Sequence, residues 1–125
     1  MGKSTLSKRE YAERYDEIAA SMYRFALCVT GDSKEAEAAM AKLFCEGYAG
    51  ACCDDFDKHM LAVLRRILER FASNNEDYSK SIKGLLPDRK YQKLIDILCK
   101  LSMSQRATLL QKLMFEYGAK ANTVC

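Results

Sequence analysis

The sequence predicts an all-α protein of about five helices. Two observations lead to this prediction: apolar residues recur every three or four positions, and helix-breaking residues are rare. The 125 residues include one proline, and most of the six glycines lie near the ends of the periodic segments. We therefore expect a three-helix N-terminal core followed by a C-terminal helical hairpin.

The first two predicted helices are joined by a very short turn. Residues 8–30 carry an apolar stripe that begins after a capping box at Ser7 and stops at Gly31. Asp32 opens a second capping pattern, and a new apolar stripe covers residues 33–48. Because the connection is so short, we expect the two helices to pack as neighbours.

The third predicted helix covers residues 56–72, and its wide apolar stripe places it between neighbours. We expect Asp54 or Asp55 to cap it. Residues 74–86 are polar at first and then contain Gly84. They are predicted to form a linker, which separates a domain over residues 1–73 from a hairpin over 87–125.

The hairpin begins at Pro87, a residue tolerated in the first turn of a helix. Its helices are predicted over residues 87–101 and 103–117, and a capping box at Ser102 opens the second one. The side chains expected to face the core are Tyr91, Leu94, Ile97, Leu98, Leu101, Leu109, Leu110, Leu113, Met114 and Tyr117.

Composition and charge restrict the function only loosely. The net charge is +3, from 20 basic and 17 acidic residues, so nucleic-acid binding requires these charges to cluster on one face. The N-terminus is polar, and no apolar run is long enough to span a membrane. We expect a cytoplasmic protein with no membrane contact.

The cysteines and the single histidine indicate no catalytic or metal chemistry. In a cytosolic chain we expect the thiols to be reduced and packed as small hydrophobic groups. Cys45, Cys52, Cys53 and His59 lack the spacing of a metal site, and no nucleophile lies beside a base. A glycine-lysine-serine-threonine run at residues 2–5 lacks the remainder of a phosphate-binding loop. We expect no cofactor, no metal and no enzyme activity.

The stretch over residues 22–48 resembles a known family. Its pattern Y-R-F-A-L-x-V-T-G-D-x-x-E-A-E, followed by an apolar helix with F-x-x-x-Y, is similar to the core domain of bacterial sigma factors of the extracytoplasmic-function type. The resemblance implies a sigma-domain-2-like fold for residues 1–73. Residues 97–106 similarly resemble the first part of sigma domain 4. No further helix-turn-helix follows Gly118, so we expect a divergent member that is truncated in this domain.

The resemblance implies that the third helix contacts DNA. Basic side chains there would neutralise phosphates, although Asp57 and Glu69 dilute them and Arg65 has the i,i+4 spacing to pair with Glu69. His59 occupies the family's tryptophan position. The candidate DNA-binding residues are Lys58, Arg65, Arg66 and Arg70.

The resemblance also implies that the second helix binds the large subunit of RNA polymerase core. Ala38 and Ala41 replace an aspartate and a glutamine that anchor this contact in the family, which argues against polymerase as the partner. The candidate interface residues are Glu37, Ala38, Ala41, Lys42 and Cys45.

We therefore predict a degenerate sigma-factor-like transcription initiation protein that binds polymerase, promoter DNA or both. The alternative is a helical protein–protein interaction module that binds an anti-sigma protein or another partner and does not bind DNA. A helical domain unrelated to transcription is a third interpretation of the same sequence.

Overall fold

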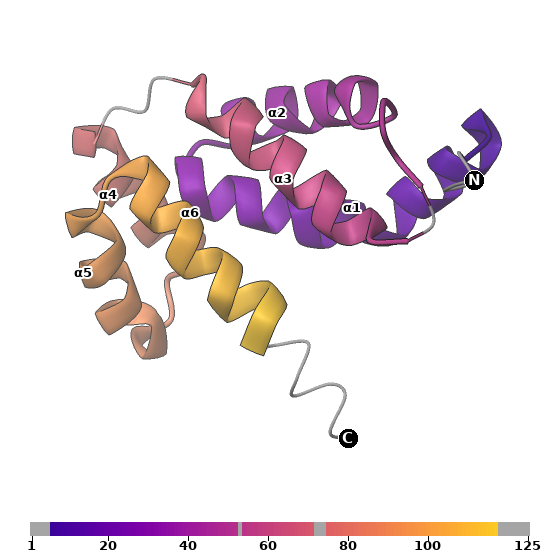
Figure 1. The fold of residues 1–125 in the computed structure, drawn as a ribbon. Coiled ribbons are helices and arrows are strands. Elements are labelled where there is room, and N and C mark those ends of the chain that lie inside the picture. Colours follow the sequence, from indigo (N-terminus) through magenta and orange to yellow (C-terminus); the bar gives the residue numbers. More distant parts are fainter. Residues whose placement is uncertain (1–5, 53, 72–74, 118–125) are drawn as a thin grey trace.

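The computed structural model describes residues 6–52, 54–71 and 75–117, and the prediction of an all-α fold is confirmed there (Figure 1). One more α-helix is present than the five expected. The described elements are α1 (Lys8–Thr30), α2 (Ser33–Glu46), α3 (Phe56–Glu69), α4 (Asn75–Leu85), the 3₁₀ turn η1 (Arg89–Tyr91), α5 (Gln92–Lys100), α6 (Met103–Gln111) and the π-helical turn η2 (Lys112–Tyr117). None of these helices has the length and apolar character needed to cross a membrane.

The ends of α1 and α2 form as predicted from local chemistry. Ser7 and Glu10 make a reciprocal capping box, with hydrogen bonds of 3.0 and 3.1 Å. Gly31 adopts the left-handed conformation with φ of 68° and ends α1. Asp32 then caps α2 by accepting hydrogen bonds from the backbone amides of Lys34 and Glu35. The two helices pack side by side.

The predicted cap of α3 is wrong. Asp55 occupies the cap position, but its side chain accepts no hydrogen bond from the helix. Its φ of 57° lies in the left-handed region, where no other non-glycine residue of the described chain is found. The chain turns into α3 at this residue, and the backbone conformation replaces the usual extended cap.

The segment predicted as a linker, residues 74–86, instead contains helix α4. Tyr78 and Ile82 lie one turn apart on this helix, and both are buried in the core. The Tyr78 hydroxyl donates a 2.6 Å hydrogen bond to the Cys28 carbonyl oxygen near the end of α1. The sequence shows only a short apolar stripe here, because α4 contributes few side chains to the core.

A buried arginine joins the C-terminal helices to α1. The Arg106 side chain is only 1% exposed and stacks on the Tyr78 ring, with its guanidinium carbon 3.7 Å from the ring centroid. It donates hydrogen bonds to the carbonyl oxygens of Val29 at 2.8 Å and Leu101 at 3.3 Å. The hydrophobic core is therefore continuous from Leu6 to Leu110 across the predicted domain boundary.

The last helices keep most of the predicted core face. Leu98 and Leu110 are buried as expected, and Leu94 and Met114 pack partly buried against the core, whereas Ile97 and Leu113 are 50% and 42% exposed. Ile95, which the prediction did not include, is buried. The span 87–101, predicted as one helix, is divided into the 3₁₀ turn η1 and helix α5. The side chain of Tyr117 lies outside the described residues.

Candidate partner and nucleic-acid surfaces

The four predicted DNA-binding residues of α3 do not form one free basic face. Arg65 is half-buried and points to α6, where it donates 3.1 Å hydrogen bonds to Gln111 and to Thr108. Arg70, which directly follows α3 and is itself exposed, forms an ion pair with Glu46 at the end of α2, with 3.5 Å between nitrogen and oxygen. Two of the four cations therefore already have partners within the protein.

The other two cations of α3, Lys58 and Arg66, are exposed. Their separation of eight residues places them about 80° apart around the helix axis. Lys58 lines a cleft of 480 Å³ together with Glu17 and Asp57, so acidic side chains share its surroundings. Because charges of both signs line this cleft, it shows no preference for an anionic ligand.

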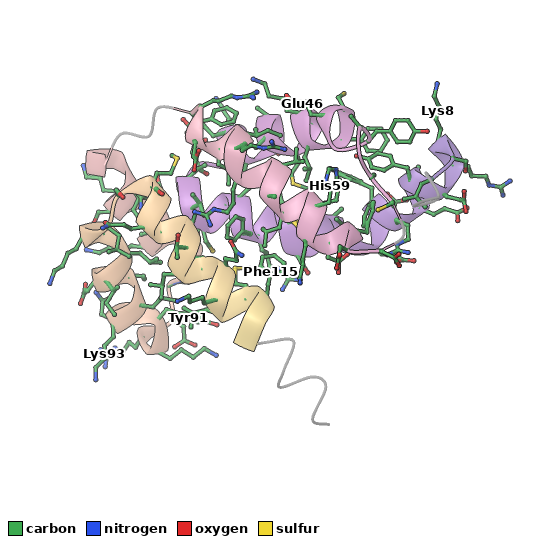
Figure 2. The ribbon with its side chains drawn as sticks, viewed as in Figure 1. Lys8, Glu46, His59, Tyr91, Lys93 and Phe115 are labelled. Carbon is green, nitrogen blue, oxygen red and sulfur yellow. The ribbon has the colours of Figure 1, made fainter. Side chains whose placement is uncertain are left out.

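His59, which occupies the family's tryptophan position, faces the connection between α2 and α3 (Figure 2). Its Nε2 atom lies 2.9 Å from the Gly47 carbonyl oxygen. Because a carbonyl oxygen only accepts hydrogen bonds, the contact places a proton on Nε2. The ring is half-buried and supports the loop, so it is not presented to stack on an unpaired base.

The five candidate interface residues of α2 lie together and all are exposed. They occupy the side of the helix opposite its buried residues Ala36, Ala39 and Leu43. Two aromatic side chains extend this surface at its C-terminal end, where Phe44 is 43% exposed and Tyr48 is 37% exposed. We call these seven residues the α2 face: Glu37, Ala38, Ala41, Lys42, Phe44, Cys45 and Tyr48.

Tyrosines of α1 hold the α2 face in place. The Tyr11 hydroxyl donates to the Phe44 carbonyl oxygen at 2.8 Å, and the Tyr15 hydroxyl donates to the Met40 carbonyl oxygen at 3.1 Å. Both rings also pack against the Phe44 ring, with centroids 5.4 and 4.9 Å away. Tyr48 in turn donates to the Leu6 carbonyl oxygen. Tyr11 and Tyr15 lie within the apolar stripe predicted over residues 8–30, but the sequence gave no sign of this supporting role.

Burial also changes the acidity of these tyrosines. Desolvation is the main cause that raises the pKa of Tyr11 to about 12, with smaller contributions from Tyr15 and Cys45. Desolvation likewise raises the pKa of Tyr15. Both hydroxyls therefore stay protonated and keep donating to α2 throughout the neutral pH range.

The described cysteines, Cys28, Cys45, Cys52 and Cys99, are free thiols. Burial raises the pKa of Cys28 and keeps it in the less reactive thiol form. Within the described ranges, no group of three or more potential metal ligands comes together. Cys53 and Cys125 lie outside the described residues.

The chain was compared with protein-family models, with curated proteins and with solved structures, and none of the three comparisons gives a match. The function is therefore inferred from the sequence pattern and from the two kinds of surface that this fold presents.

Proposed function

We propose that this chain is a sigma-factor-like protein that acts by binding another protein through the α2 face, and that α3 does not read promoter DNA. The observation that carries the proposal is the α2 face itself, where exposed Phe44 and Tyr48 border the small side chains of Ala38, Ala41 and Cys45. The relation to sigma factors rests on the resemblance of residues 22–48.

The composition of the α2 face suits a protein partner. Aromatic side chains are enriched in protein–protein interfaces, and charged residues are depleted at their centres. Here the small residues allow close approach of a partner helix, while Glu37 and Lys42 lie among them with opposite charges. A partner with an apolar helical surface therefore fits this face better than a strongly charged partner does.

The rigidity of the α2 face favours binding as well. Tyr11 and Tyr15 fix the backbone of α2 through three hydrogen bonds, to the carbonyl oxygens of Leu43, Phe44 and Met40. A surface that is already ordered loses little conformational entropy when a partner docks. The exposed aromatic rings are thus presented in one arrangement before binding.

The other candidate function is promoter DNA binding through α3, for which Lys58 and Arg66 are the exposed cations. It is the weaker candidate, because Arg65 and Arg70 would first have to leave their partners on α6 and α2. Each broken hydrogen bond to a charged group opposes such a rearrangement.

Two sources of a helical partner are consistent with the resemblance: RNA polymerase core and an anti-sigma protein. Ala38 and Ala41 offer no polar group to the polymerase contact, so we propose the anti-sigma type of partner. Restoring the family's residues with Ala38→Asp and Ala41→Gln tests the assignment, because it should create polymerase binding and weaken binding to an apolar partner.

The proposal is tested by measuring the affinity of the purified chain for core polymerase and for candidate anti-sigma proteins from the same genome. Ala41→Arg should weaken partner binding at least tenfold, because it places a long charged side chain at the centre of the α2 face. The matched control is Ala62→Arg, which alters an exposed alanine on α3. Partner binding that survives both Ala41→Arg and Phe44→Ala would refute the proposal.

A further inference from the structure

The positive charge of this protein is concentrated in one short segment. Residues 89–100, which form η1 and α5, contain four basic residues and one acidic residue, a net charge of +3. The whole chain also has a net charge of +3, so the other 113 residues contain sixteen basic and sixteen acidic residues. The segment therefore has the same net charge as the whole chain, although an acidic residue, Asp88, directly precedes it.

The basic side chains of the segment are all exposed. Lys93 and Lys100 are seven residues apart on α5 and lie within about 20° of each other around the helix axis. Figure 2 shows Lys93 projecting outward, at the opposite end of the molecule from Lys8. We call the four residues the α5 basic face: Arg89, Lys90, Lys93 and Lys100.

The α5 basic face makes no ion pair within the described part of the protein, although the exposed acids Asp88 and Asp96 lie close to it in sequence. The ion pairs found there involve Arg9, Arg14 and Arg70, all on other elements. The one acid of the segment, Asp96, accepts a hydrogen bond from the Gln92 amide. Lys90 lies over the Tyr91 ring at 5.1 Å, a contact that leaves its ammonium group charged and exposed.

From this arrangement we propose that the α5 basic face binds the phosphate backbone of duplex nucleic acid, at a site separate from the α2 face. Lys93 and Lys100 are about 10 Å apart along the helix, and a duplex presents one charge per about 1.7 Å of its axis. A row of this length therefore lies against several phosphates. The one aromatic ring of the segment, Tyr91, is half-buried and packs partly against the core, so we expect an electrostatic contact that is independent of base sequence.

The composition of this face argues against a protein or a membrane as the ligand. Three of its four cations are lysines, and lysine is depleted in protein–protein interfaces. A helix that lies in a membrane surface needs an apolar side to insert, but Ile95 and Leu98 of α5 are buried in the core. Ile97, half exposed, is the one apolar side chain left on this side of α5.

The test is fluorescence anisotropy of the full chain with a labelled 20-base-pair duplex of arbitrary sequence, at several salt concentrations. The wild-type chain should bind weakly at 50 mM salt, and log K against log salt should have a slope of about −3, for three or four neutralised phosphates. The variant Lys90→Gln, Lys93→Gln, Lys100→Gln should bind at least tenfold more weakly and flatten the slope by about two units or more.

A matched control variant distinguishes the loss of this site from a general loss of positive charge. Lys8→Gln, Arg24→Gln, Lys34→Gln also removes three exposed positive charges, but from α1 and α2. It should keep at least half of the wild-type affinity and most of the slope. Circular dichroism of both variants shows whether they remain folded, which is expected because all six side chains are exposed.

Three outcomes would overturn the proposal. The first is no duplex binding by the wild-type chain at 50 mM salt, and the second is an equal loss of affinity in both variants. The third is binding to vesicles with 30% phosphatidylserine that equals or exceeds binding to the duplex. None of these outcomes bears on partner binding through the α2 face, which is measured with different variants.

Discussion

Helix α3 together with Arg70, which directly follows it, carries four cations, and so does the segment formed by η1 and α5. The sequence alone favoured α3 as the DNA-binding element. In the structure, the two sets of cations differ in whether they have partners within the protein. On α3, Arg65 is held by α6 and Arg70 by Glu46 of α2, whereas the α5 basic face makes no ion pair in the described chain. The number of charges on a helix therefore does not tell how many are available to a ligand.

The difference follows from where each helix lies in the fold. Helix α3 packs between α2 and α6, so polar groups of both neighbours are within reach of its arginines (Figure 1). Helix α5 lies at the edge of the molecule and packs mainly on α4, which leaves one side to solvent. Arg65 and Arg70 therefore have partners within the protein, whereas the cations at the edge of the molecule make no ion pair in the described chain.

Replacing Arg106 should have the largest effect on stability, because its side chain joins α6 to the end of α1. We expect Arg106→Met to lower the free energy of unfolding by about 3 kcal/mol, since it removes the donor from the buried Val29 carbonyl oxygen and from the part-buried Leu101 carbonyl oxygen. Urea unfolding followed by circular dichroism measures the change. The control Arg66→Met, at an exposed position, should stay within about 0.5 kcal/mol of wild type.

Replacing Gly31 or Gly84 with alanine should change the free energy of unfolding in opposite directions. Gly31→Ala should cost about 2 kcal/mol, because φ is 68° and the new Cβ would lie 2.6 Å from the Tyr78 ring. Gly84→Ala on α4 should stabilise by up to about 1 kcal/mol, because nothing lies within 4 Å of its Cβ position and alanine favours the helix. Unchanged stability in Gly31→Ala would contradict the described positions of Gly31 and the Tyr78 ring.

High pH should lower the stability of the protein through Tyr11, which supports the α2 face. The pKa of Tyr11 is about 12 in the folded protein against 10.0 as its ordinary value, so the unfolded chain loses this proton first. The tyrosine contribution to stability is fully present below pH 10 and is lost as the pH rises from 10 to 12. Unfolding experiments across this range should show a falling stability, and Tyr11→Phe should reduce the slope. An unchanged slope in the variant would place the cause elsewhere.

The smallest effect is expected at Asp55. Glycine adopts a φ of 57° without strain, so Asp55→Gly should raise the free energy of unfolding by about 0.5 kcal/mol. Asp54→Gly, one residue earlier, should not stabilise, because Asp54 has no positive φ. Thermal unfolding of the two variants provides the comparison, and a loss of stability in Asp55→Gly would restore the predicted capping role.

The sequence predicted helices best where local chemistry determines them. The capping boxes at Ser7 and Ser102 form as expected, and so does the stop at Gly31, because each depends on residues within one turn. Helix α4 was missed because its stability comes from burying Tyr78 and Ile82 against distant elements.

The candidate surfaces were predictable in part. Periodicity places the five candidate interface residues Glu37, Ala38, Ala41, Lys42 and Cys45 opposite the buried stripe of the second helix, as observed. It put Phe44 and Tyr48 on the apolar stripe itself, whereas both are exposed. The partners of Arg65 and Arg70 lie 46 and 24 residues away in the chain, at Gln111 and Glu46, so no local pattern could reveal them. The sequence did not single out the α5 basic face, because four basic residues on an amphipathic helix are ordinary until the structure shows that they make no ion pair.

The comparison between the two helices is tested most directly by one pair of matched variants. Lys58→Gln with Arg66→Gln removes the two exposed cations of α3, and Lys93→Gln with Lys100→Gln removes two from α5. In salt titrations of duplex DNA binding, the α5 pair should flatten the slope of log K against log salt by about two units, and the α3 pair by less than about half a unit. A flatter slope for the α3 pair, with an unchanged slope for the α5 pair, would contradict the assignment of duplex binding to the α5 basic face.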